Sequence, residues 1–383
     1  MIRALIDIRS LSKGRTSGVE AYTIGLLAPL LRRAPEDVAF TLFYNALRPA
    51  PLPPPLTSSP NVAIVVRHIP NKLLDLSSRF LHVSTSSAFA DADIAFTPLL
   101  NLLRTRPSVA RVMTFHDLSF VHYPEFFPAQ KRWWHWLQDC RREARRAAAV
   151  IVDSEFTKAD LVGTFGVSSD RVRVIYPGVS ATGEAERAAP DLAPFARTHG
   201  VDGPFILSVG VVEPRKNLPA LVQAFSLLKS EARNRDLKLV VVGELGWLYE
   251  ETLRAFDVSP YRDDIVRWGR AEADDLRKLY ALARVFAYPS FFEGFGFPPL
   301  EAQASGVPVV ASNRSSVPEV VGNAALLVNP WNPSELAAAI DAFLENEQLR
   351  KKYIENGYVN VKRFSWERAA DELLSLFRSV APC

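Results

Sequence analysis

Two glutamates frame a short apolar segment in the second half of the chain. Glu293 and Glu301 are separated by GFGFPPL, which contains two glycines, two prolines and no charged residue. We expect a strand to end before this segment and a helix to begin within it, because proline is tolerated in the first turn of a helix. Gly294 and Gly296 would then expose backbone N–H groups beside a helix N-terminus, where anions bind. The pattern predicts an anion-binding loop with a carboxylate at each end.

Two adjacent cations lie at a similar turn earlier in the chain. FILSVG (205–210) has the composition of a strand that ends in glycine, and Arg215 and Lys216 follow just before an apolar helical pattern. Arg can clamp a phosphate through two parallel hydrogen bonds and Lys adds a compact charge, so the pair suits a diphosphate. LKLVVVG (237–243) repeats this plan, and Gly243 would let a ligand approach the backbone closely.

Each of these features also has a purely structural interpretation. Taken alone, an Arg-Lys pair is more often solvated, and the two glutamates are as often a helix cap and a surface residue. Together they fit a nucleotide sugar, which carries hydroxyl groups on both sides of a diphosphate. Ionised carboxylates accept hydrogen bonds from such hydroxyls. We therefore expect one glutamate at each sugar ring, with the cations and the loop amides at the phosphates between them.

Short apolar runs alternate with longer amphipathic stretches along the whole chain. In the first half the predicted strands are 3–8, 39–44, 62–66, 93–96, 111–115, 149–152 and 172–176. In the second half they are 205–210, 237–243, 264–269, 284–290, 307–312 and 324–328. Strands that alternate with helices form parallel sheets through right-handed crossovers, and helices cover both faces. The fold class is therefore α/β, with two doubly wound, Rossmann-like domains in tandem.

The predicted domain boundary lies in 177–204, a stretch rich in Pro, Gly and Ala with no strand period. We assign 1–185 to an N-terminal domain and 200–364 to a C-terminal domain. Ligands of such sheets gather at the carboxyl ends of the strands. We therefore expect the functional site in a cleft between the two domains.

Composition limits the class of protein. The length of 383 residues suits two domains better than one core, and 48% hydrophobic with 23% charged residues is typical of a globular protein. No apolar run reaches the roughly 20 residues that span a bilayer, and Asp7 interrupts the first apolar run, so the start is no secretory signal. With only Cys140 and Cys383, we expect no disulfide framework, no cysteine metal site and a cytoplasmic location.

The charge is distributed unevenly along the chain. Residues 1–180 carry 22 Lys and Arg against 15 Asp and Glu, whereas residues 181–383 carry 23 against 27. A basic first half favours an anionic partner there, either a membrane surface or a phosphorylated ligand. Nucleic acid is not expected as a partner, because no helix-turn-helix, zinc-finger or RNA-recognition signature is present.

Several motifs in order resemble those of the retaining family 4 glycosyltransferases. They are SGVEAY (17–22), TFHDLSFVHYPEFF (114–127), VDSEFTKADL (152–161), VIYPGV (174–179), VGVVEPRKNL (209–218) and EGFGFPPLE (293–301) with the AQASGVPVVAS that follows. The resemblance covers nearly the whole chain. It implies a GT-B fold, with the acceptor on the N-terminal domain and a nucleotide sugar on the C-terminal domain. It also implies that a last helix, within 365–383, returns to the N-terminal domain.

The resemblance assigns roles to single residues around the donor. Arg215 and Lys216 resemble the cations that hold the donor diphosphate. Glu301 resembles the glutamate that binds the ribose hydroxyls. Many family members have an arginine directly after the strand glycine, where this chain has Val211, so Arg215 would take over that charge. From its place directly after a strand, rather than from the resemblance, we also expect Gly243 to lie against the donor.

Around the transferred sugar, the resemblance points to two catalytic residues. Glu293 resembles the glutamate that contacts this sugar, with the amides of Gly294, Phe295 and Gly296 nearby. His116 resembles the histidine that faces the sugar near the reaction centre; without the resemblance, a histidine at a strand end is more often structural. Gly18 stands where many members have two glycines beside the donor.

The predicted function is transfer of a hexose with retention of configuration. TFHDLSFVHYPEFF and VEPRKN are most similar to the mannosyltransferase-like branch, which implies GDP-mannose as donor and a glycan or lipid-linked acceptor. No Asp-x-Asp motif or histidine cluster offers metal ligands at the expected cleft, so we expect neither a metal nor another cofactor. The alternatives are a UDP-sugar donor, a sugar-nucleotide epimerase and a non-catalytic protein that binds sugar nucleotides. A nicotinamide oxidoreductase is disfavoured, because no G-x-G-x-x-G follows the first strand.

KRWWHWLQDCRREARR (131–146) combines three tryptophans with five arginines and one lysine. Taken as one helix, it places Trp133, Trp136 with Leu137, and Cys140 on one face. Indoles beside cations are typical of a helix at a membrane surface. The same pattern also fits a domain helix whose apolar face lies in the core. The sequence thus leaves two interpretations, of which one is peripheral contact with the inner face of the cell membrane.

Overall fold

The computed structural model describes residues 1–14, 18–33, 35–48, 50–57, 62–80, 91–179 and 192–382. The chain divides into two compact units. Unit 1 comprises Met1–Phe120, Ala129–Gly178 and Phe364–Cys383, and unit 2 comprises Val121–Pro128 and Val179–Arg363. Residues Val121–Pro128 lie inside the range predicted for the N-terminal domain, but they group with unit 2.

Unit 1 is built on a seven-stranded parallel sheet in the order β3-β2-β1-β4-β5-β6-β7. Its strands are β1 (Ile2–Asp7), β2 (Val38–Asn45), β3 (Val62–Arg67), β4 (Ile94–Thr97), β5 (Ala110–Phe115), β6 (Ala149–Val152) and β7 (Val172–Val174). Its helices are η1 (Arg9–Lys13), α1 (Gly18–Arg33), α2 (Pro54–Thr57), α3 (Asn71–Phe80), α5 (Ala129–Gln138), α6 (Cys140–Arg146), α7 (Glu155–Phe165), η3 (Ser169–Arg171) and α17 (Trp366–Val380), and α4 (Ser119–His122) begins in it. Apolar side chains of α6 and α7 pack with those of β5 and β6.

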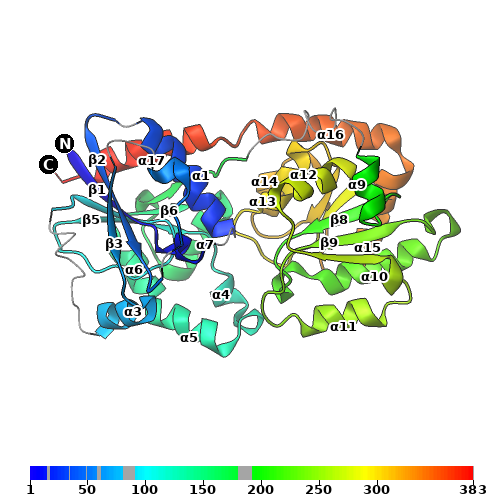
Figure 1. The fold of residues 1–383 in the computed structure, drawn as a ribbon, viewed down its shortest axis with the longest axis horizontal. Helices are drawn as coiled ribbons and strands as arrows, with labels where there is room; N and C mark the ends of the chain where they lie inside the picture. Colours follow the sequence, from blue (N-terminus) through cyan, green and yellow to red (C-terminus); the bar gives the residue numbers. More distant parts are fainter. Residues whose placement is uncertain are drawn as a thin grey trace. The chain divides into compact units, whose positions relative to one another are not determined.

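The last helix of the chain, α17, packs beside α1 within unit 1 (Figure 1). Trp366 at the start of α17 comes so close that a Cβ at Gly178 would lie 2.2 Å from its backbone nitrogen. A Cβ at Gly25 of α1 would lie 2.4 Å from its ring. Arg33 of α1 forms exposed ion pairs with Glu367 and Asp371 on α17. The close approach of these elements therefore depends on glycine at two positions.

Unit 2 is built on a six-stranded parallel sheet in the order β10-β9-β8-β11-β12-β13. Its strands are β8 (Phe205–Val209), β9 (Lys238–Val242), β10 (Ile265–Gly269), β11 (Val285–Tyr288), β12 (Val309–Ser312) and β13 (Ala325–Val328). Its helices are η2 (Pro124–Phe126), α9 (Ala193–Thr198), η4 (Pro214–Lys216), α10 (Leu218–Lys229), η5 (Ala232–Asn234), α11 (Glu250–Val258), η6 (Arg262–Asp264), α12 (Ala273–Leu282), α13 (Phe297–Ala304), α14 (Val317–Val321), α15 (Pro333–Glu345) and α16 (Glu347–Val361).

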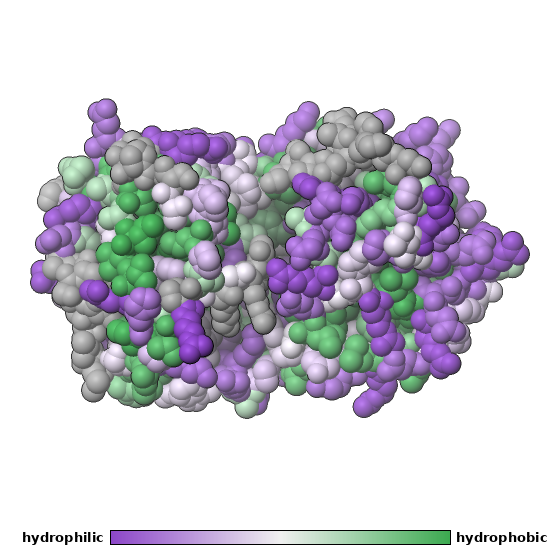
Figure 2. All heavy atoms as spheres, in the orientation of Figure 1, coloured by the Kyte–Doolittle hydropathy of each residue, from purple (hydrophilic) through white to green (hydrophobic). Residues whose placement is uncertain are grey.

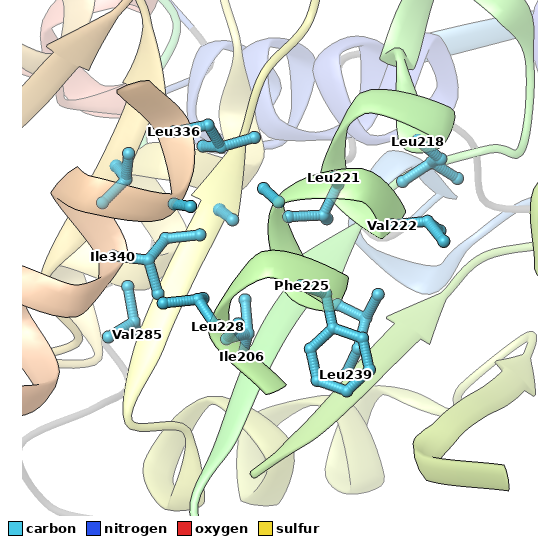
Figure 3. Packing of buried hydrophobic residues seen from close by; sticks show 14 of the residues in the cluster. Ile206, Leu218, Leu221, Val222, Phe225, Leu228, Leu239, Val285, Leu336 and Ile340 are labelled. Carbon is cyan, nitrogen blue, oxygen red and sulfur yellow. The ribbon is translucent and has the colours of Figure 1, made fainter. Parts of the chain in front are cut away.

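The core of unit 2 has two layers because successive strand residues point to opposite faces of the sheet. Ile206 of β8 belongs to one apolar cluster, whereas its neighbours Phe205 and Leu207 belong to the other. In the first cluster, Phe225 from α10 and Ile340 from α15 pack over the strands, as Figure 3 shows. Both faces of the parallel sheet are thus covered, as in a doubly wound domain.

The structure confirms the predicted α/β class and each of the predicted strands, with ends that differ by a few residues. The prediction of one helix over 131–146 is wrong. Asp139 adopts a left-handed backbone conformation with φ +49°, which ends α5 and lets α6 begin in a new direction. Of the residues expected on one face, Leu137 and Cys140 are buried, while Trp133 and Trp136 are exposed. In the described part of the chain, no helix is both long and apolar enough to cross a membrane.

Candidate functional site

Two adjacent strands of unit 2 bring the predicted cations and the first glutamate together. β8 and β11 are parallel neighbours, so the loops that follow them start at the same edge of the sheet. The loop after β8 carries η4 with Arg215 and Lys216, and the loop after β11 carries Glu293. The backbone N–H of Phe291 donates to the carbonyl of Arg215 at 2.9 Å and joins the two loops.

Glu293 lies at the centre of a buried ion-pair cluster. Its Oε1 accepts hydrogen bonds from Lys216 Nζ and from the Tyr288 hydroxyl, each at 2.8 Å. Its Oε2 accepts from Arg215 Nη1. Lys216 Nζ also donates to the Tyr288 hydroxyl at 2.7 Å, and Arg215 Nη2 donates to Glu213 at 2.7 Å. The cluster thus holds two cations and two carboxylates, which balance in charge.

The electrostatics of the cluster keep Glu293 ionised. Burial alone would raise the pKa of Glu293, but the charges of Arg215 and Lys216 outweigh it and lower the pKa to about 2. Burial lowers the pKa of Lys216, against the attraction of Glu293. Burial and the charge of Glu293 raise the pKa of Tyr288 well above its ordinary value. Tyr288 therefore stays neutral and donates a hydrogen bond to the carboxylate of Glu293.

The glycine loop that follows Glu293 is tied to the next strand-to-helix connection. Gly296 has φ +104° at the start of α13, a conformation that L side chains rarely adopt. Ser316 Oγ lies 2.8 Å from the carbonyl oxygen of Glu293 and 3.1 Å from that of Phe295. The carbonyls of this loop are therefore held by Ser316, which favours a fixed orientation of the amides from Gly294 to Gly296.

Glu301 lies in α13, as predicted, and is held by a residue from the neighbouring helix α12. The Tyr280 hydroxyl donates to Glu301 Oε2 at 2.9 Å. Burial raises the pKa of Glu301, partly offset by this hydrogen bond. The structure describes no bond between Glu301 and the cluster around Glu293, so the two carboxylates have separate hydrogen-bond partners within the described residues.

The glycines after β8 and β9 pack on one another. A Cβ at Gly243 would lie 1.9 Å from the carbonyl oxygen of Gly210, so the backbones approach too closely for any side chain. Gly243 thus has a packing role, and its predicted contact with a ligand stays a prediction. A small pocket beside these glycines is lined by Ser208, Val209, Gly210, Lys216, Leu218, Val241 and Tyr288.

The other two predicted residues belong to unit 1. Gly18 is the exposed first residue of α1, and a Cβ there would meet nothing within 4 Å, so packing does not require glycine. His116 follows β5, and its Nδ1 lies 2.6 Å from Asp153 Oδ2. Its Nε2 lies 3.0 Å from the carbonyl oxygen of Pro98. The rings of Tyr22 and His116 pack in a T-shaped arrangement, with 4.7 Å between the ring centroids.

Sequence reasoning did not find the partners of these side chains. Tyr288, Tyr280 and Asp153 lack any distinctive spacing in the chain, although Asp153 lies in a motif that carried the resemblance. The signal that could have found Asp153 is its place directly after a strand, as for His116. No group of three or more His, Cys, Asp or Glu side chains in the described ranges is placed to hold a metal ion.

Comparisons with known proteins relate this site to a family. The family model Glycosyltransferase Family 4 matches residues 16–182, and the model Glycosyl transferases group 1 matches residues 192–360. The O-antigen chain mannosyltransferase B of Escherichia coli is 33% identical over 270 residues, which cover 70% of each chain. The serotype-specific mannosyltransferase WbdA of Escherichia coli is 29% identical over 264 residues, 68% of this chain but only 32% of that protein.

A solved structure also shares the fold. The structure of HepE from Anabaena in complex with UDP-glucose has a TM-score of 0.73 at 18% identity, and the match covers 99% of this chain and 100% of that chain. At this level of identity, the likeness concerns the arrangement of the elements alone.

Proposed function

The chain belongs to glycosyltransferase family 4 and has the GT-B fold, and we propose that it transfers mannose from GDP-mannose to a hydroxyl group of a glycan or lipid-linked acceptor. The two relatives from Escherichia coli are named mannosyltransferases, which supports mannose as the transferred sugar. The observation that carries the proposal is the cluster of Arg215, Lys216 and Glu293 where the loops after β8 and β11 meet.

In this proposal, Arg215 and Lys216 bind the diphosphate of the donor. Both cations are paired with Glu293 in this structure, so a bound diphosphate would compete with this carboxylate for them. The competition turns Glu293 away from the cations and toward the hydroxyl groups of the transferred sugar. Binding of the donor and reorientation of Glu293 are then coupled, because the diphosphate and Glu293 bind the same two cations.

The transfer itself would leave the configuration of the sugar unchanged. The bond between the anomeric carbon and the phosphate oxygen breaks, and the acceptor oxygen forms its bond to that carbon on the same face. The acceptor proton passes to the departing phosphate oxygen, and the negative charge of the diphosphate is stabilised by Arg215, Lys216 and the loop amides.

We also propose that the two side-chain cations supply the positive charge that other transferases take from a metal ion. Arg215 and Lys216 neutralise two carboxylates in this structure, so they can neutralise a diphosphate of similar charge. Activity that is the same with a chelator and with added Mg²⁺ would support this. A rate that disappears with the chelator and returns with Mg²⁺ would contradict it.

A surface of unit 1 supports contact with an anionic membrane. α3 and α5 lie next to one another and expose Leu73, Leu76, Phe80, Trp133 and Trp136. Figure 2 shows apolar surface over α3 and over β3 of this unit. The same helices and α6 also carry exposed cations: Lys72, Arg132, Arg141 and Arg142. Apolar side chains with cations beside them fit a bilayer of anionic lipids. We propose this face, rather than 131–146 alone, as the membrane contact.

The transfer proposal is tested by product analysis. The protein is incubated with GDP-mannose and a synthetic mannose-terminated acceptor, and the new linkage is analysed by NMR. We expect a mannosylated product with the α configuration of the donor. A β linkage would contradict retention, transfer from UDP-glucose but not GDP-mannose would contradict the donor, and an altered nucleotide sugar without acceptor would indicate an epimerase.

A further inference from the structure

Three adjacent strands of unit 1 place the groups that surround His116. Pro98, His116 and Asp153 each follow the carboxyl end of a strand, namely β4, β5 and β6, which are neighbours in the parallel sheet. Asp153 is buried, and its Oδ2 lies 2.6 Å from His116 Nδ1. On the other side of the ring, the Pro98 carbonyl oxygen lies 3.0 Å from Nε2. Both ring nitrogens therefore face oxygen atoms.

The hydrogen-bond partners decide how many protons the ring carries. A carbonyl oxygen only accepts, so Nε2 must carry a hydrogen to bond with Pro98. The remaining proton lies between Nδ1 and Asp153, and it belongs on the ring because imidazole is ordinarily the stronger base. A neutral ring would need a protonated Asp153 in its place. This order of basicity favours an imidazolium bonded to a carboxylate, against the burial that raises the pKa of Asp153.

The surrounding charges favour the same state. Burial lowers the pKa of His116, but the charge and hydrogen bond of Asp153 and the Pro98 carbonyl outweigh it and raise the pKa. Asp117, the other carboxylate that acts on the ring, adds to the rise. The Tyr22 hydroxyl stays neutral, because burial raises its own pKa well above the ordinary value.

We propose that His116 works as a fixed imidazolium, and that Asp153 is the positioning residue that keeps this ring protonated and oriented. The histidine then supplies positive charge and cannot take the proton of the acceptor hydroxyl, since both of its nitrogens already carry hydrogen. Within the described residues, Asp153 Oδ1 is buried and receives no hydrogen bond, which a carboxylate with a purely structural role would normally avoid. The role of the charge in catalysis rests on the proposed function, but the protonation state does not.

The protonation state is measured directly by NMR of protein labelled with ¹⁵N-histidine. Comparison with His116→Gln identifies the His116 signals. We expect two protonated nitrogens on His116 at pH 7.5, where an unperturbed histidine is mostly neutral. His135 provides the contrast in the same spectrum, because burial lowers its pKa to about 4. A single neutral tautomer of His116 at pH 7.5 would overturn the proposal, whether or not the protein is active.

The pH dependence of kcat distinguishes a cationic role of His116 in catalysis from a role as general base. If His116 serves as a cation, kcat falls as the pH rises through its pKa; if it were a general base, kcat would rise there. Asp153→Asn should lower the pKa of His116 and move this fall to lower pH. At a pH above both pKa values, the protonated fraction decreases about tenfold for each pH unit by which the pKa is lowered. Asp170→Asn, which removes an exposed carboxylate of the same unit, should leave the profile unchanged. An unchanged profile in Asp153→Asn would overturn the positioning role.

Discussion

At the scale of single residues, Glu293 connects the cations of the site to the sugar that we propose it contacts. Its carboxylate accepts hydrogen bonds from Arg215, Lys216 and Tyr288, so its strong bonds in this structure are made within the protein. Each oxygen of the carboxylate binds one of the two cations, and this keeps both cations at positions where an anion can bind them. The same side chain becomes available to hydroxyl groups only when an anion replaces it. A variant of Glu293 should therefore change kcat and the Kd for GDP in different ways.

Replacement of Glu293 should remove transfer but not nucleotide binding. In Glu293→Ala we expect kcat to fall on the order of a hundredfold or more, as when one strong electrostatic contact to the reacting group is lost. The Kd for GDP should stay the same or decrease, because the competing carboxylate is gone. Kinetics and calorimetry measure the two effects. Glu293→Gln, which keeps the shape of the side chain, serves as a second variant because removal of one buried ion-pair partner can destabilise the fold.

Full turnover in both variants would contradict the assignment of Glu293. A Kd for GDP that rises in parallel with the loss of kcat would instead indicate that the cations need Glu293 to hold their positions.

Replacement of Glu301 should instead weaken the binding of GDP. Tyr280 binds one oxygen of its carboxylate, which leaves the other oxygen for the ribose hydroxyls. In Glu301→Ala we expect the Kd for GDP to rise roughly tenfold to a hundredfold, the value of a hydrogen bond to a charged group. Glu355→Ala, an exposed carboxylate on α16, is the control. An unchanged Kd, measured by calorimetry, would remove the ribose role.

At the scale of the elements, unit 1 depends on the contact between α17 and the rest of the unit. Gly178→Ala would place a methyl group 2.2 Å from the backbone nitrogen of Trp366, where backbone atoms cannot give way cheaply. We expect the Tm of this variant to be clearly lower than that of the wild-type protein, since strain in a packed region lowers the free energy of unfolding by about 1–3 kcal/mol. Gly163→Ala on α7 is the matched control, because its Cβ would meet nothing within 4 Å and alanine favours a helix by up to about 1 kcal/mol.

Equal melting temperatures for the two glycine variants would mean that α17 can shift without cost. In that case the tight contact would not hold the helix in place.

The paired helices α3 and α5 give the membrane proposal its own test. Trp133 is 50% exposed and Trp136 is 58% exposed, although large indoles are usually covered in a folded chain. We expect the protein to float with vesicles that contain anionic lipids, less so with neutral vesicles, and the double variant Trp133→Ala with Trp136→Ala to remain mostly in solution. Trp268→Ala in unit 2 is the control. Recovery of the wild-type protein wholly in solution would contradict the proposal.

At the scale of the whole molecule, the fold could be predicted from local patterns, because each strand is a short apolar run between helical stretches. The helix break at Asp139 could not be predicted, because only the backbone conformation of that one residue separates α5 from α6. Arg215, Lys216 and Glu293 were predicted as site residues, but their bonds to one another and to Tyr288 and Glu213 were not. The carboxylate that Arg215 binds is set by the packing of two loops, and its partner Glu293 lies 78 residues further along the chain. The role of Asp153 was not predicted either, because its bond to His116 also depends on the packing of two separate loops.

The identity of the donor base can be measured on the whole molecule by thermal unfolding with GDP, UDP and ADP in parallel. A ligand that binds only the folded state adds about 2.7 kcal/mol of stability at a concentration a hundredfold above its Kd. We expect GDP to raise the Tm most, and to raise it equally with a chelator and with Mg²⁺, because Arg215 and Lys216 hold the diphosphate. The variant Arg215→Ala with Lys216→Ala should lose this rise in Tm. A larger rise with UDP would replace the guanosine donor by a uridine donor. A rise that survives the loss of both cations would place the diphosphate elsewhere on the protein and refute the site itself.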